Sequence, residues 1–138
     1  MLKKLLFDGE WGLSPQANIA LTVLRVFCGL SLMLAHGMGK LPPSEQFISG
    51  TAGMGFPVPT AFSWAAAMAE FLGGAFLALG LFTRVASFFI CFTMTTALVG
   101  VHYHDPYAKK ELAGLYLAIA GAFLIMGAND WSVDKAIK

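Results

Sequence analysis

The sequence predicts an all-α membrane protein, in which four transmembrane helices form an antiparallel bundle behind a short N-terminal interfacial segment. The first supporting observation is the composition: 57% hydrophobic residues, 12% charged residues and a mean hydropathy of +0.69 do not suit a soluble globule. The second is a set of four apolar stretches, each near the roughly 20 residues that a helix needs to cross a bilayer. They cover residues 17–35, 58–81, 85–101 and 112–128. With 138 residues, we expect one integral membrane domain, residues 1–138.

The chain begins with residues 1–11, in which Lys3 and Lys4 precede an apolar run of only three residues. This run is too short for a signal peptide, so we expect the segment to remain in the mature protein at the membrane interface. The first apolar stretch starts behind Ser14 and Pro15, an N-cap residue followed by a proline at the first helical position.

The connections predict how neighbouring helices are arranged. The loop from Lys40 to Pro57 is rich in glycine and proline but also carries Phe47, Ile48, Met54 and Phe56. This loop either dips into the lipid headgroups or covers the mouth of the bundle as a lid. Residues 81–84 are so short a connection that the second and third spans must be antiparallel neighbours.

An even number of spans places both termini on the same side of the membrane. The positive side chains on that side are Lys3, Lys4, Arg84, Lys135 and Lys138, against Lys40, Lys109 and Lys110 on the other. This imbalance predicts cytoplasmic termini. The net charge of +1 gives no indication of nucleic-acid binding.

Two charged residues, Arg25 and Glu70, lie within apolar stretches, where an ionised group costs about 2.5 to 3.5 kcal/mol. At roughly 1.5 Å per residue, the two are expected about 12 and 16 Å deep, which predicts an ion pair. The pair is either a structural device that fixes helix register or, with Thr95 or His36, a binding point or proton path. A ligand headgroup such as a quinone carbonyl would suit that point. A third alternative has Arg25 reaching out towards lipid headgroups.

Small residues let membrane helices approach one another closely. We expect such packing at five glycines: Gly29, Gly73, Gly74, Gly114 and Gly121.

The histidines and cysteines give weaker indications. His36, His102 and His104 are expected at the outer interface, where imidazoles could hold copper or zinc. However, His102 and His104 are two residues apart and point different ways on a helix, so no metal site is predicted. Cys28 and Cys91 have no CxxC spacing and are expected to be free thiols that fill the core.

Four pieces of sequence carry a family resemblance: LRVFCGLSLMLAHGMGK (24–40), AEFLGGAFLALGLFTR (69–84), VHYHDPYAKKE (101–111) and NDWSVD (129–134). In these pieces and their order, the chain resembles the DoxX family of small four-helix bacterial membrane proteins. The matching polar and glycine positions are Arg25, His36, Glu70, Gly73, Gly74, Arg84, His102 and Glu111. The resemblance implies a multi-pass protein of the bacterial cytoplasmic (inner) membrane. It also implies a loose association with redox chemistry, because some relatives resemble quinone-linked subunits or membrane partners of thiol and superoxide defence enzymes.

The leading hypothesis is therefore a quinone-interacting subunit or accessory component of a membrane redox system. Because the chain has no haem, flavin or iron-sulfur motif, an oxidoreductase activity would depend on a quinone or on a redox partner protein. The alternatives are a small-solute transporter that acts as a homo-oligomer, since four short helices enclose little space, and a membrane assembly or scaffold protein.

Overall fold

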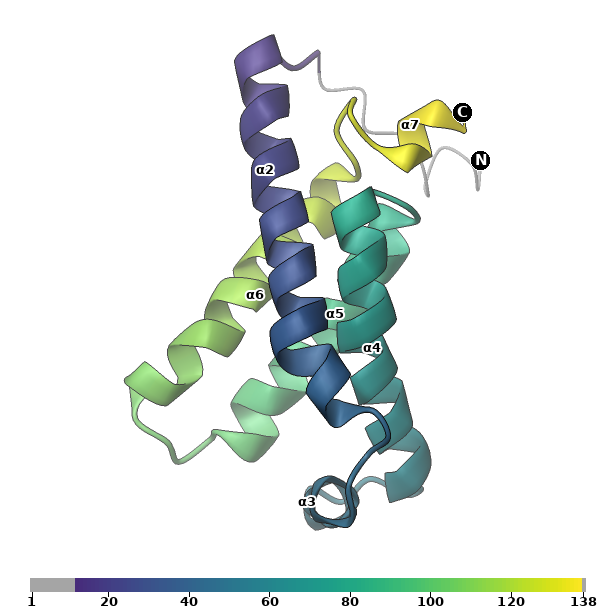
Figure 1. Ribbon diagram of the computed structural model, residues 1–138. Coiled ribbons are helices and arrows are strands. Elements are labelled where there is room, and N and C mark those ends of the chain that lie inside the picture. The colour runs from purple at the N-terminus through teal and green to yellow at the C-terminus, as the bar shows by residue number, and fades with distance from the viewer. Residues whose placement is uncertain (1–11, 138) are drawn as a thin grey trace.

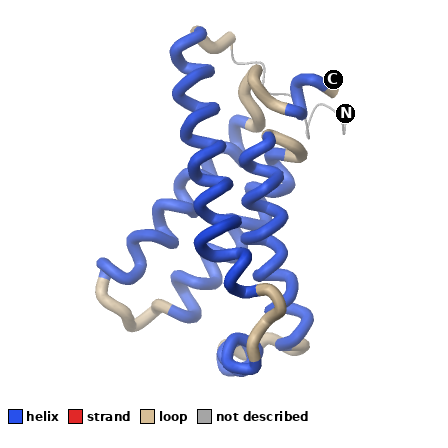
Figure 2. The backbone as a smooth tube through the Cα atoms, viewed as in Figure 1, coloured by secondary structure: helices blue, strands red, loops and turns tan. Residues whose placement is uncertain are grey.

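The computed structural model describes residues 12–137, and within this range all regular structure is helical (Figures 1 and 2). The expected interfacial segment, residues 1–11, lies outside the described residues. The helices, in order, are α2 (Pro15–Ser31), the π-helix η1 (Leu32–Gly37), the 3-10 helix η2 (Met38–Lys40), α3 (Glu45–Gly53), α4 (Pro59–Leu79), α5 (Thr83–Thr96), the π-helix η3 (Ala97–Val101), α6 (Tyr107–Met126) and α7 (Val133–Ala136).

The first span is one continuous rod made of α2, η1 and η2. Its start follows the predicted signals, because the Ser14 hydroxyl accepts a hydrogen bond from the Ala17 amide at 3.2 Å and Pro15 occupies the first helical position. The rod continues through two glycines to Lys40, five residues beyond the predicted end at residue 35. This extension matters because it brings Lys40 to the end of a spanning helix and not into a loop.

Three helical stretches in the described part of the chain are long and apolar enough to cross a membrane: Pro15–Lys40, Pro59–Leu79 and Thr83–Val101. The fourth predicted span corresponds to α6, which is 20 residues long. Its first five residues include Lys109, Lys110 and Glu111, so that only the stretch after them is apolar. That remainder is shorter than the roughly 20 residues that a span needs, and α6 therefore lacks the apolar length of the other three.

The helix α4 lies at the centre of the packing. It contacts α2 and η1 on one side, α5 on another and α3 at one end, while α5 packs against α6 (Figure 1). The chain reverses between α4 and α5 through residues 80–82, where Gly80 adopts a left-handed conformation with φ 67°. The buried apolar core joins α2, η1, α4, α5 and α6. It consists of Cys28, Leu32, Leu77, Ile90, Met94, Tyr116, Ala120 and Phe123.

Glycines allow α2 and α4 to approach backbone to backbone. A Cβ atom at Gly29 would lie 2.5 Å from the Gly74 carbonyl oxygen, and one at Gly74 would lie 2.7 Å from the Gly29 oxygen. At Gly73, a Cβ would lie 3.3 Å from a side-chain carbon of Ile90 on α5. These contacts show why small residues are needed where the central helices cross.

The expectation of close packing at Gly114 and Gly121 is wrong. A Cβ at either position on α6 would meet no heavy atom of the described residues within 4 Å. Small residues permit a close approach but do not create one, and the core of α6 is made instead by its larger residues Tyr116 and Phe123.

Candidate functional site

Arg25 is buried, with 1% of its surface exposed, and it holds backbone carbonyl groups. Its Nη1 donates to the carbonyl oxygens of Leu77 at 2.9 Å and Ala78 at 3.0 Å, and its Nη2 donates to that of Trp131 at 2.8 Å. The last carbonyls of a helix have no partner within the helix and carry partial negative charge. Arg25 thus caps the C-terminus of α4 and ties the C-terminal segment to it.

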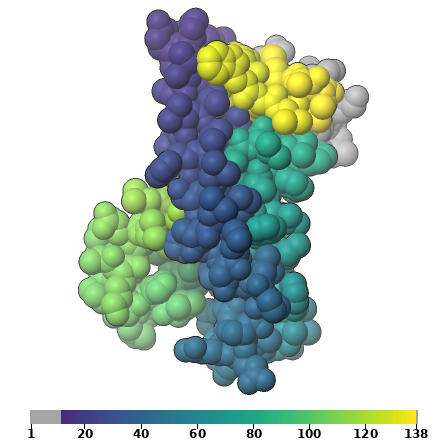
Figure 3. All heavy atoms as spheres, viewed as in Figure 1, coloured from purple at the N-terminus to yellow at the C-terminus, as the bar shows by residue number. Residues whose placement is uncertain are grey.

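The C-terminal segment completes a set of polar contacts that we call the polar clamp, defined by Asn18, Arg25, Asn129 and Asp134. Asp134 accepts hydrogen bonds from the backbone amides of Phe82 at 2.7 Å and of the next residue at 2.9 Å, at the start of α5. The side-chain amide of Asn129 donates to the backbone carbonyl oxygen of Asn18 at 3.0 Å. In Figure 3 these C-terminal residues, in yellow, lie against the first turns of α2 and the turn between α4 and α5.

The predicted ion pair between Arg25 and Glu70 is wrong. Arg25 lies level with Leu77 and Ala78, which follow Glu70 by seven and eight residues, roughly 11 Å along α4 at 1.5 Å per residue. Counting depth inward from the cytoplasmic end of each apolar stretch failed because α2 starts well beyond the level at which α4 ends (Figure 1). Burial also contradicts the alternative in which Arg25 reaches out to lipid headgroups.

Glu70 pairs instead with Lys40. The Lys40 Nζ lies 2.6 Å from one carboxylate oxygen of Glu70 and 2.7 Å from the other, and Glu70 is only 3% exposed. The same ammonium group lies 5.7 Å from the centre of the Phe47 ring, a distance that suits a cation–π interaction. A buried carboxylate near the middle of a spanning helix is thus neutralised by a lysine from the end of another.

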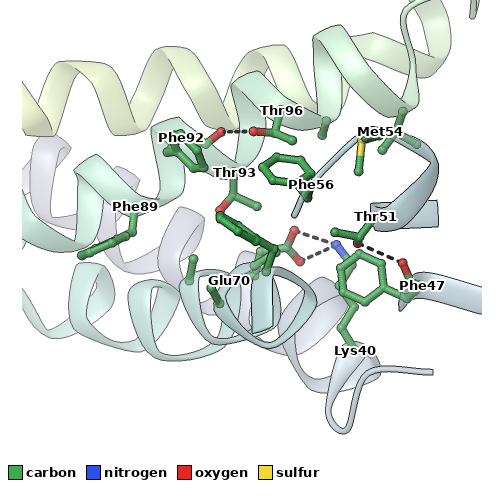
Figure 4. A pocket seen from close by; sticks show the side chains of 16 residues that line it. Lys40, Phe47, Thr51, Met54, Phe56, Glu70, Phe89, Phe92, Thr93 and Thr96 are labelled. Carbon is green, nitrogen blue, oxygen red and sulfur yellow. Dashed lines mark hydrogen bonds and ion pairs between the residues drawn. The ribbon is translucent and has the colours of Figure 1, made fainter. Parts of the chain in front are cut away.

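This ion pair lies beside a cavity of about 230 Å³ (Figure 4). Its walls come from the end of η2, from α3 and the turn after it, from α4, and from α5 with η3. The lining residues are Lys40, Phe47, Thr51, Met54, Phe56, Phe62, Ala65, Ala66, Ala69, Glu70, Phe89, Phe92, Thr93, Thr96, Ala97 and Val101. An apolar, aromatic cavity with a few polar groups at one place is typical of a small-molecule site.

The helix α3 lies over this cavity, as the lid interpretation of the loop predicted. It is held to α4 by a hydrogen bond of 2.8 Å between the hydroxyl groups of Thr51 and Ser63, both of which are buried. Phe47 and Met54 on this segment face the cavity. The apolar residues in a glycine- and proline-rich loop were therefore the useful signal.

Two other predicted site residues, His36 and Thr95, lie outside the cavity lining. Thr95 is exposed, while Thr93 and Thr96 line the cavity. The helical stripe that selected Thr95 was counted from Arg84, whose Nη2 donates to the Ile125 carbonyl oxygen on α6. The buried face of α5 consists of Thr83, Ala86, Ser87, Ile90 and Met94.

The three histidines have different neighbours. His36 is half-buried, and its ring meets the edge of Tyr116 with centroids 5.6 Å apart. His102 Nδ1 lies 2.7 Å from a carboxylate oxygen of Asp105, and this hydrogen bond lowers the pKa of Asp105 below its usual value. His104 packs against the neighbouring Tyr103 ring. Between residues 12 and 137, no group of three histidine, cysteine, aspartate or glutamate side chains is placed to hold a metal ion.

Sequence reasoning missed Lys40 as a site residue, and Thr93 and Thr96 with it. One signal for Lys40 was available, because no proline interrupts the chain before Pro42 and the helix is free to continue. A lysine at the end of a span can also turn its long side chain along apolar surface towards a polar partner.

Comparisons with known proteins identify a family and a relative of this chain. The family model named DoxX matches residues 20–103, a range that contains Arg25, Glu70 and the whole cavity lining. The inner membrane protein YphA of Escherichia coli (strain K12) is 28% identical over 126 residues, which cover 85% of this chain and 89% of that protein. No solved structure matches the chain.

Proposed function

This chain belongs to the DoxX family of membrane proteins, and from that premise we propose that it is a quinone-interacting component of a membrane redox system. The observation that carries the proposal is the buried Glu70 carboxylate, paired with the partly exposed Lys40 ammonium group beside an aromatic cavity. A quinone ring is flat and apolar and would lie against the phenylalanine side chains. One of its carbonyl oxygens would accept a hydrogen bond from Lys40, and a quinol hydroxyl would donate to Glu70.

The membrane arrangement is part of the same proposal. The name of the Escherichia coli relative supports a location in the bacterial inner membrane. We place α6 as the fourth span of an antiparallel bundle, with Lys109 and Lys110 turned towards the headgroups, so that its shorter apolar stretch suffices. Cytoplasmic termini follow from the five positive residues on their side against three on the other.

The chain needs a partner for redox chemistry, because its sequence has no motif for haem, flavin or iron-sulfur clusters. It would bind and orient the quinone, while a redox partner protein supplies or removes the electrons. A homo-oligomer is compatible with this role.

The experiment is to purify the full chain in mild detergent, extract it, and identify the co-purified small molecules by mass spectrometry. We expect a quinone with the wild type and its loss in Glu70→Gln. Glu111→Gln is a matched control, because it removes the same charge from an exposed carboxylate on α6. Phospholipid alone in all three samples would contradict the proposal and favour a scaffold, whereas solute flux in liposomes that contain only this chain would favour a transporter.

A further inference from the structure

The charges beside the cavity balance each other. Of the 16 described residues that line the cavity, two are charged, Lys40 and Glu70, and they contact each other through both carboxylate oxygens. Figure 4 shows the carboxylate and the ammonium group facing each other at one edge of the cavity. A ligand in the cavity therefore contacts an ion pair that carries no net charge.

The surroundings make this balance important for binding. The walls around the pair are mainly phenylalanine and alanine side chains, so that the local dielectric constant is low and an additional unpaired charge is strongly disfavoured. An incoming anion would be repelled by the Glu70 carboxylate, and Lys40 already has a partner. An uncharged hydroxyl or carbonyl group can bond to the pair without adding a charge.

The cavity wall formed by α5 indicates where a ligand comes from. Phe89 and Phe92 both line the cavity, yet each is 53% exposed, and both lie on a membrane-spanning helix. The outer side of such a helix faces hydrocarbon. This wall therefore separates the cavity from lipid by little more than two aromatic rings, and a lipid-soluble molecule has a short path into it.

We propose that Glu70 determines the substrate class of this site. By neutralising Lys40 it restricts the cavity to uncharged, lipid-soluble molecules with a hydrogen-bonding head, and it excludes lipid anions such as fatty acids. The inference rests on the proposed use of the cavity as a ligand site, but it does not require that the ligand be a quinone.

The test uses the purified full chain in detergent and two probes that share one alkyl chain, dodecanol and dodecanoate, at a mildly alkaline pH that keeps the acid ionised. Binding of each radiolabelled probe is measured by equilibrium dialysis against protein-free detergent. We expect the wild type to prefer the alcohol. Glu70→Gln should shift the affinity ratio towards the acid by about tenfold or more, the size of one charge-assisted hydrogen bond. The double variant Lys40→Met with Glu70→Gln should return the ratio to that of the wild type, and Glu111→Gln should not change it.

Equal binding of both probes by the wild type would overturn the proposal, as would an unchanged ratio in a folded Glu70→Gln variant. If that single variant does not fold, the wild type and the uncharged double variant still decide, because both must prefer the alcohol. The result of this binding test can be distinguished from the result of the quinone experiment. Absence of a co-purified quinone together with the expected shift in ratio would reject the quinone and keep the charge selection.

Discussion

Arg25 and Lys40 lie on the same helical rod and both contact other parts of the protein, but their partners are of different kinds. In the polar clamp, both Nη groups of Arg25 are bonded to backbone carbonyls at the end of α4 and at Trp131, whereas Lys40 bonds to one carboxylate beside a cavity. Backbone carbonyls at a helix end are fixed in place, so the clamp stabilises the fold and has little to offer a ligand. A side-chain ion pair at a cavity wall can replace some of its own hydrogen bonds with hydrogen bonds to a ligand. A buried charge in a membrane helix therefore indicates function only when its partner faces a cavity.

The largest loss of stability is expected for Arg25→Met. The change removes the donor to the Ala78 and Trp131 carbonyl groups and leaves the Leu77 carbonyl with the Gly80 amide alone. We expect it to cost about 3 to 5 kcal/mol of stability. Thermal unfolding in detergent measures the loss. The control is Arg84→Met, because Arg84 also donates to a carbonyl at a helix end but in an exposed contact, and it should cost less than Arg25→Met. Equal losses would show that burial does not distinguish the clamp.

A second, smaller effect is expected where α2 crosses α4, between the clamp and the cavity. In Gly29→Ala the new methyl group would lie 2.5 Å from backbone atoms of Gly74 and Ala78, so the helices must move apart. We expect a loss of about 1 to 3 kcal/mol in the same unfolding measurement. Gly114→Ala is the matched control, since its methyl group meets nothing within 4 Å, and stability there should not fall.

The ion pair beside the cavity should contribute much less to stability than the polar clamp does. Replacing both members of the ion pair, Lys40→Met with Glu70→Gln, removes the buried carboxylate together with its partly exposed partner, and we expect stability to change by no more than about 1 kcal/mol. Unfolding and probe binding are measured on the same sample. A loss as large as that of Arg25→Met would mean that this pair holds the fold together, as the clamp does.

The smallest expected effect lies in the second loop, outside both regions. The hydrogen bond from His102 lowers the pKa of Asp105, so this carboxylate contributes stability above its unfolded-state pKa, and the contribution is lost as the pH falls through the lowered value. In His102→Ala the pKa should rise towards the usual value of about 3.9, measured by NMR of the carboxyl carbon. The His104→Ala control should leave it unchanged, because His104 contacts Tyr103 instead.

Much of the fold could be predicted from the sequence because it depends on local properties. Apolar length located the helices, and Ser14 with Pro15 fixed the start of the first one. The candidate site could be predicted only in part. Glu70 was identified from its burial in an apolar stretch, but its partner was not, because helical periodicity says which way a residue faces and not how far two helices are shifted along each other.

Two contacts of the chain depend on its tertiary structure. The wide turn of η1 and the continuation of the rod through η2 brought Lys40 to Glu70, although the sequence there reads as the start of a loop. The offset between α2 and α4 sent Arg25 to the carbonyl groups at the end of α4. By itself the sequence determined that the chain is helical, belongs in a membrane and carries buried charges, because these follow from the hydrophobicity and spacing of neighbouring residues. Which charges meet depends on the relative shift of packed helices, and that is set by contacts between residues far apart in the chain.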